Sequence, residues 1–251
     1  MKKIFLALAI TLLPCSLLAI PDNSAALTAD RMYRDGNYTE AASLYEQVIA
    51  DGYASADLYY NLGNAYYRSD RIGLAILNYE RALRIKPSMS DARENLALAE
   101  SRTVDRITPM PKLFIVRWVD ALCTHFSPVA WRIVWLVLLT LFCLSVVVMR
   151  LGSRHSLRKA GLVAAIVSLL LLTIATCFLL LSSHRYNAHT DAVVTQQSVS
   201  VKNSPELQSA DKFILHEGSR LTVSDSLADW YRITIADGTT GWCHVSDIER
   251  I

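Results

Sequence analysis

The pattern of apolar and polar positions divides the chain into three regions with different periods. Between about residues 24 and 105, apolar side chains recur every three or four positions, which predicts amphipathic helices. Two long runs without charged residues follow, at 133–149 and 160–183. From about residue 190 the apolar positions alternate in short runs, which predicts β-strands. The predicted fold class is a multidomain membrane protein with an all-α repeat domain, a two-helix transmembrane hairpin and an all-β barrel.

The first region repeats its pattern at an interval of 34 residues. The positions that carry the pattern are Tyr59, Leu62, Gly63, Tyr66, Ala75, Tyr79, Ala82 and Pro87. Their offsets resemble the tetratricopeptide repeat, in which two antiparallel helices form one unit. Ala41 and Tyr45 fall in the same frame one interval earlier, which indicates a degenerate first repeat. A last helix, from Ser88 to about Asp105, is expected to cap the domain at 24–105. An ordinary pair of helical hairpins is the alternative.

Repeats of this kind bind peptides on the concave face formed by their first helices. The residues expected on that face are Asp57, Tyr60, Asn64, Tyr67 and Arg68. Asn64 stands where repeats that clamp a terminal carboxylate carry asparagine. Tyr60 stands where those repeats carry lysine, which argues against that ligand class. The alternative is that all five side chains are simply solvated.

The amino terminus has the pattern of an export signal. Two lysines precede an apolar run that is too short to cross about 30 Å of hydrocarbon, so a secretory signal over residues 1–19 is predicted. A lipoprotein signal that uses Cys15 and an uncleaved anchor are the alternatives. All three place the repeat domain outside the cytoplasm.

The uncharged runs predict two membrane spans. A linker and an interfacial helix are expected over 106–128, the first span over 129–149 and the second over 160–183. The loop between the spans, 150–159, carries four basic residues and no acidic one, which is typical of a cytoplasmic loop. Both ends of the hairpin are then outside, in agreement with the signal. The spans contain no Asp, Glu, Lys or Arg, so a transport path is not expected.

The third region, 190–251, reads as a small barrel of five short strands. The residues concerned are Val199, Val201, His216, Glu217, Gly218, Trp230, Tyr231, Ile233, Asp237, Gly238, Gly241, Trp242, Ile248 and Ile251. They resemble the bacterial SH3 domain. Ile233 and Ile235 are expected to point inward. Trp230, Tyr231 and Trp242 are candidates for an aromatic groove that binds peptides or cell-wall stems, and the alternative is that at least one tryptophan belongs to the core.

Charge and residue chemistry exclude several classes of function. Residues 22–120 carry a net charge of −2 and residues 184–251 a net charge of −3, so nucleic-acid binding is not expected. The six histidines are scattered, and the sequence contains no nucleotide-binding loop and no zinc-ligand spacing. We therefore expect no enzyme activity, no catalytic or metal-binding residues and no cofactor.

The order of signal, repeats, two spans and barrel resembles the BatE family of Bacteroides aerotolerance proteins. The resemblance implies an inner-membrane scaffold that presents both modules to the periplasm and acts in aerotolerance or stress. It also implies partners, namely membrane-anchored von Willebrand factor A proteins and, indirectly, a MoxR-type ATPase. The alternative is a sensor or anchor that binds peptidoglycan through the SH3-like domain.

Overall fold

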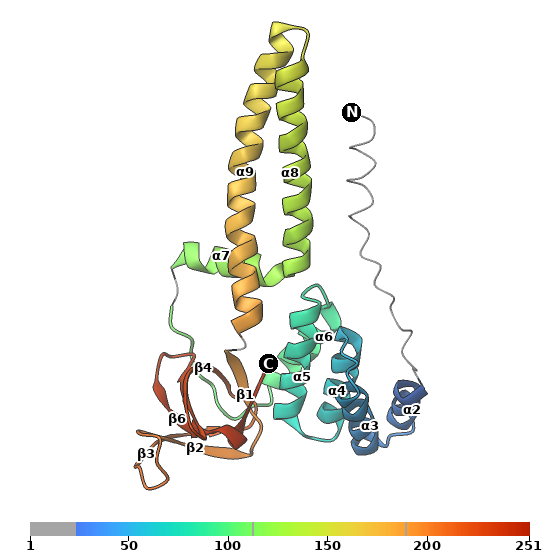
Figure 1. Cartoon of the computed structure of the whole chain (residues 1–251). Coiled ribbons are helices and arrows are strands. Elements are labelled where there is room, and N and C mark those ends of the chain that lie inside the picture. Colours follow the sequence, from blue (N-terminus) through green and yellow to red (C-terminus); the bar gives the residue numbers. More distant parts are fainter. Residues whose placement is uncertain (1–23, 112, 189) are drawn as a thin grey trace.

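The structure is a computed structural model that describes residues 24–111, 113–188 and 190–251 (Figure 1). The predicted signal peptide, residues 1–19, lies outside the described residues. A helical domain and a sheet domain lie beside each other at the same end of a long helical hairpin (Figure 1).

The helical domain consists of helices that pack against their neighbours in chain order. They are α2 (Ser24–Arg34), α3 (Tyr38–Ala50), α4 (Ala56–Arg68), α5 (Ile72–Ile85) and α6 (Ser90–Glu100). Small residues allow close packing: a Cβ atom on Gly63 would lie 2.7 Å from the Tyr79 ring. The Ser55 hydroxyl caps α4 by accepting a hydrogen bond from the Leu58 amide at 3.1 Å. The predicted repeat helices and the last, capping helix are all present.

The hairpin follows a short amphipathic helix. The three helices are α7 (Phe114–His125), α8 (Pro128–Leu151) and α9 (His155–Ala188), and α8 and α9 are each long and apolar enough to cross a membrane. Several apolar side chains of α7 are exposed, including Phe114 at 78% and Trp118 at 73%. Trp135 Nε1 donates a hydrogen bond to Thr176 Oγ1 at 3.0 Å between α8 and α9.

The connection between α8 and α9 is shorter than the predicted ten-residue loop. Only residues 152–154 separate the helices, because no proline or glycine interrupts the chain from His155 to Lys159 and α9 begins early. The basic residues of the predicted loop therefore lie at the helix ends and in a tight turn.

The sheet domain has seven antiparallel strands, two more than the sequence analysis predicts. They are β1 (Asp191–Val194), β2 (Ser198–Lys202), β3 (Asp211–His216), β4 (Arg220–Leu227), β5 (Trp230–Ile235), β6 (Thr240–His244) and β7 (Ile248–Arg250). Their order in the sheet is β3-β2-β6-β5-β4-β1-β7. The core includes Ile233 and Ile235, which confirms their inward direction.

The two additional strands, β1 and β7, pair with each other at one edge of the sheet. β1 could not be recognised in the sequence because no turn signal separates it from α9, and β7 could not because it has only three residues. The side chains of β1 enter two different cores. Val193 belongs to the core of the helical domain, whereas Ala192 and Val194 belong to the core of the sheet domain. The strand β1 therefore joins the two domains.

The segment between α6 and α7 lies on the sheet domain. Ile107 packs against the core of that domain, and the Met110 amide donates a hydrogen bond to the Ala236 carbonyl at 3.0 Å. The first part of the segment predicted as a linker is therefore held on the sheet domain at Ile107 and Met110.

Candidate functional site

The concave side of the helical domain contains a pocket of about 200 Å³. Its lining comes from α2, α3 and α4 and consists of Asp30, Tyr33, Arg34, Tyr45, Asn61 and Asn64. Polar side chains dominate this lining, and both signs of charge are present. The pocket is thus suited to hydrogen bonding with a polar chain.

Asp30 organises one end of this pocket. Its carboxylate accepts hydrogen bonds from the Tyr45 hydroxyl and, at 3.4 Å, from Asn61 Nδ2. Burial, and then the neighbouring carboxylate of Asp30, raise the pKa of Tyr45 well above its usual range. Tyr45 therefore stays protonated and keeps donating to Asp30.

Asn64 organises the other end. Its side-chain oxygen accepts hydrogen bonds from the Tyr79 hydroxyl and from Asn95 Nδ2, both at 2.8 Å. Asn95 also donates to the Tyr60 hydroxyl at 3.2 Å. Two of the predicted ligand positions, Tyr60 and Asn64, thus also hold α4 against α5 and α6.

The other three predicted positions are less constrained by their neighbours. Asp57 is exposed in the first turn of α4. Arg68, also exposed, donates to the Tyr38 hydroxyl at 2.7 Å. The guanidinium of Arg102 lies over the ring of Tyr67, 5.3 Å from its centroid.

The first repeat contributes to this pocket through residues that were not among the predicted positions. Asp30 lies one 34-residue interval before Asn64, and Arg34 lies one interval before Arg68. The 34-residue period could therefore have predicted both positions. It was obscured because the opening helix of the first repeat lacks the usual apolar residues.

The three aromatic residues predicted to form a groove on the sheet domain are divided between two faces. Trp230 pairs across the strands with His244, and Trp242 pairs with Arg232, so both tryptophans share one face of β5 and β6. Tyr231 points to the opposite face, where it packs against the core, because successive strand residues alternate. Both tryptophans are half-buried and lie outside the core, so the sheet domain has an aromatic face without Tyr231.

The turn between β3 and β4 docks on the helical domain. The Glu217 carboxylate accepts a hydrogen bond from the Gly73 amide at 2.7 Å, in the first turn of α5. Gly218 has a φ of +87°, and a Cβ atom there would lie 2.8 Å from Thr103 Cγ2 and 2.9 Å from Ile76 Cδ1. Glycine is required at this position by both the backbone and the contact.

Charged side chains surround this contact. Arg220 forms ion pairs with Glu80 and Glu100, and burial raises the pKa of Glu80 although Arg220 opposes the shift. Arg81 pairs with Glu249 at 2.9 Å. The two domains are thus joined by matched charges as well as by the shared strand β1.

Asp105 anchors the connecting segment at the same interface. Its carboxylate accepts hydrogen bonds from the Ser219 hydroxyl and from the His216 amide at 2.7 Å, and it lies 2.8 Å from His216 Nδ1. Burial raises the pKa of Asp105, but these hydrogen bonds lower it by more, so the net pKa lies below its usual value. Asp105 therefore remains ionised at neutral pH.

Comparison with known families identifies the two domains. Residues 27–90 match the family model of the tetratricopeptide repeat, and residues 198–249 match that of the bacterial SH3 domain. The chain therefore carries a tetratricopeptide repeat region and a bacterial SH3 domain. Both are typically interaction modules without catalytic activity, and neither match indicates an enzyme family. No curated protein matches the chain.

Within the described residues, no group of three or more His, Cys, Asp or Glu side chains could hold a metal ion. Among the described cysteines, Cys143, Cys177 and Cys243 carry free thiols. The candidate binding sites are therefore the repeat pocket, the aromatic face of the SH3 domain and the surfaces where the modules meet.

Proposed function

We propose that this protein is a bacterial inner-membrane adaptor that holds a protein partner in the pocket of its tetratricopeptide repeats. The observation that carries the proposal is the joining of the repeats and the SH3 domain through β1 and the Glu217–Gly73 contact. Such a docked pair presents two interaction modules in one fixed orientation. A scaffold gains from this arrangement because its partners are positioned relative to each other.

We further propose that both domains lie in the periplasm and that the turn at 152–154 lies in the cytoplasm. Contacts of the segment before α8 with the end of α9 and with the chain after it support a common side for both domains, since Arg84 of α5 donates to the carbonyls of Tyr186 and Ile251. The basic residues around the turn support the orientation. The proposed limits remain 24–105 for the repeat domain, 129–149 and 160–183 for the two spans, and 190–251 for the SH3-like domain.

The order of the modules supports a place in the BatE family. On that basis, the proposed partners are von Willebrand factor A-type envelope proteins, linked to a MoxR-type ATPase in the cytoplasm, and the proposed process is aerotolerance or stress resistance. The adaptor would act without catalysis and without a cofactor.

The test is affinity purification of the full-length protein from detergent after crosslinking in cells. The wild type should recover a specific set of envelope proteins, and Asp57→Lys combined with Arg68→Glu should lose it. Both positions are exposed, so the variant is expected to fold. The matched control is the same pair of charge changes on the exposed positions Glu40 and Arg106. Equal recovery by wild type, variant and control would refute the placement of the partner on this face of the repeats, and recovery of no specific envelope protein by the wild type would refute the adaptor function.

The aromatic face of the SH3 domain supports a second candidate, binding of peptidoglycan. Trp230 packs edge-on against His244 with a centroid distance of 5.7 Å, and Trp242 follows on the same face. Aromatic surfaces of this kind can stack on sugars and peptide stems. Full-length protein should sediment with purified cell walls, and Trp230→Ala with Trp242→Ala should abolish sedimentation. Unchanged sedimentation of the double variant would exclude this face as the binding site for peptidoglycan.

A further inference from the structure

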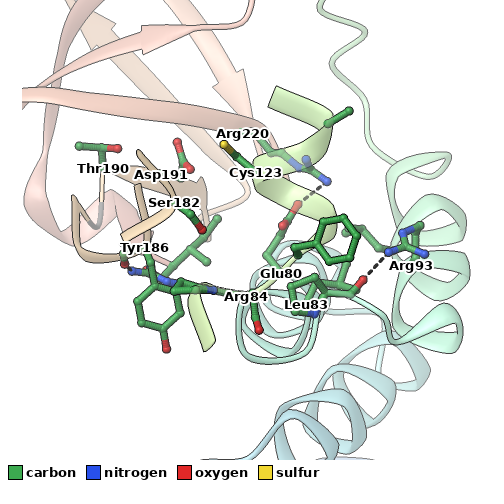
Figure 2. A pocket seen from close by; sticks show the side chains of 17 residues that line it. Glu80, Leu83, Arg84, Arg93, Cys123, Ser182, Tyr186, Thr190, Asp191 and Arg220 are labelled. Carbon is green, nitrogen blue, oxygen red and sulfur yellow. Dashed lines mark hydrogen bonds and ion pairs between the residues drawn. The ribbon is translucent and has the colours of Figure 1, made fainter. Parts of the chain in front are cut away.

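A pocket lies where the repeats, the membrane hairpin and the SH3 domain meet (Figure 2). Its volume is about 570 Å³, within the range of about 300–1,000 Å³ that is usual for small-molecule sites. The walls come from α5 and α6, from the junction of α7 and α8, from the end of α9 and from β1 and β4. No part of the proposed adaptor function uses this pocket.

The position of the pocket coincides with the proposed membrane surface. Pro128 is the first residue of α8, and Ser182 and Tyr186 lie in the last turns of α9, so the lining includes the outer ends of both spans. A ligand in this place has access to water on one side and to hydrocarbon on the other. Leu83, Leu96 and Phe126 supply apolar wall.

The charged lining contains both signs. Arginines 84, 93 and 220 and the carboxylates of Glu80 and Asp191 face this pocket (Figure 2). Arg220 is already balanced by Glu80 and Glu100. A site for an anionic lipid would be predominantly basic, whereas this lining suits a ligand that carries a cation and an anion together.

Arg93 and Asp191 are the groups best placed to bind such a ligand. Arg93 donates to the Pro87 carbonyl, and its guanidinium carries further N–H groups. The Asp191 carboxylate accepts a long hydrogen bond, 3.4 Å, from Thr222. Both side chains are on exposed residues, so both can exchange water for a ligand.

We propose that this junction pocket binds a phospholipid whose headgroup carries a primary amine. The phosphate contacts Arg93, the ammonium contacts the carboxylate of Asp191, and the acyl chains follow Phe126 and α9 into the bilayer. The lipid fills the space between the modules and fixes the periplasmic pair at the membrane surface.

Native mass spectrometry of the full-length protein tests this proposal. The protein is purified in detergent and exposed to equal amounts of phosphatidylethanolamine, phosphatidylglycerol and phosphatidylcholine. Phosphatidylethanolamine should be retained preferentially, because a choline headgroup cannot donate a hydrogen bond and phosphatidylglycerol lacks the cation. Arg93→Ala and Asp191→Asn should each lower its occupancy about tenfold, the effect of losing one charge-assisted hydrogen bond.

Arg102→Ala is the matched control, because Arg102 is exposed on the same domain and pairs with Asp70 outside the pocket. It should leave lipid retention unchanged. Soluble glycerophosphoethanolamine should not displace the lipid at equal concentration; displacement would mean that the headgroup alone is recognised and would overturn the lipid assignment. Retention of all three lipids alike, or equal retention by the Arg93 and Arg102 variants, would also overturn it. These results are independent of whether a protein partner binds the repeats.

Discussion

The Glu217 carboxylate lies 2.7 Å from the amide of Gly73, so a residue of the SH3 domain caps a helix of the repeat domain. The first amides of a helix have no partner within the helix, and a negative charge near them is favourable. The same residue belongs to the motif by which the SH3 domain resembles its family. The docking of the two modules therefore uses one of the turns by which the SH3 domain resembles its family.

Gly73→Ala should weaken this docking. A Cβ atom on Gly73 would lie 2.6 Å from Glu217 Cγ and 2.7 Å from the Val194 carbonyl oxygen, which is backbone and cannot move away alone. We expect the free energy of unfolding to fall by about 1–3 kcal/mol, as for other overpacked sites. A loss of stability would be informative in itself. Inside helices alanine is favoured over glycine by about 1 kcal/mol, so without the clash the substitution would stabilise α5. Urea unfolding of the full chain, followed by tryptophan fluorescence, measures the change.

Ser43→Ala serves as the control for this substitution, because Ser43 is exposed in α3 and lies away from the interface. It should change stability by about 0.5 kcal/mol or less. A Gly73→Ala protein that is as stable as the wild type or more stable would contradict the docking described above.

Acid should weaken the interface through Asp105. The pKa of this carboxylate is lowered in the folded protein from a usual value of 3.8, so its stabilising effect is complete above that value. The effect is lost as the pH falls through the lower, folded pKa. Limited proteolysis should therefore cleave the segment around residues 106–111 faster below about pH 4 than at pH 6.

Asp105→Asn should make cleavage of the same segment faster at pH 6 and nearly independent of pH between 3 and 6. Asp229→Asn changes an exposed aspartate of the SH3 domain and should behave like the wild type. An acid-induced increase in cleavage that survives in Asp105→Asn would assign the sensitivity to other groups.

Asn64 should matter for stability as well as for ligand binding. Asn64→Ala removes the acceptor of Tyr79 and Asn95, so the buried Tyr79 hydroxyl loses the oxygen to which it donates. We expect a loss of about 1–3 kcal/mol in the free energy of unfolding. Asp57→Ala, at an exposed helix start, should cost about 0.3–1 kcal/mol. Equal losses of stability in the Asn64→Ala and Asp57→Ala variants would contradict the conclusion that Asn64, unlike Asp57, holds α4 against α5 and α6.

The helices could be predicted from the sequence because their information is local. The 34-residue interval placed Tyr79 and Ala75 in the core, and both are buried. The same interval could have located Asp30 and Arg34 in the pocket. The apolar runs likewise predicted α8 and α9, because a helix that crosses a membrane needs only length and apolar composition.

The docking of the modules could not be predicted in this way. Gly73 and Glu217 are 144 residues apart, and neither position is unusual in its own module. Val193 in β1 is apolar like its neighbours, and nothing in its local sequence indicates that it enters the core of another domain. Such contacts depend on tertiary packing, which local periodicity does not encode.

The proposed topology can be tested with cysteines placed at exposed positions. The native Cys123 and Cys243 are unsuitable because both are buried, and burial, followed by the charge of Asp247, raises the pKa of Cys243 to about 12. Ser226→Cys on β4 should react with a membrane-impermeant maleimide on intact spheroplasts. Ser153→Cys in the turn between α8 and α9 should react only after permeabilisation. The reverse pattern of labelling would invert the orientation.

The central claim, that the concave pocket of the repeats holds a protein partner, is tested most directly by photocrosslinking in cells. A photoreactive amino acid is placed at Arg68 beside the pocket and, as a control, at Gln47, an exposed position in the second helix of the first repeat. The adaptor function predicts a discrete crosslinked adduct with an envelope protein from position 68 and none from position 47. The absence of an adduct at position 68, or the same adduct from both positions, would contradict it.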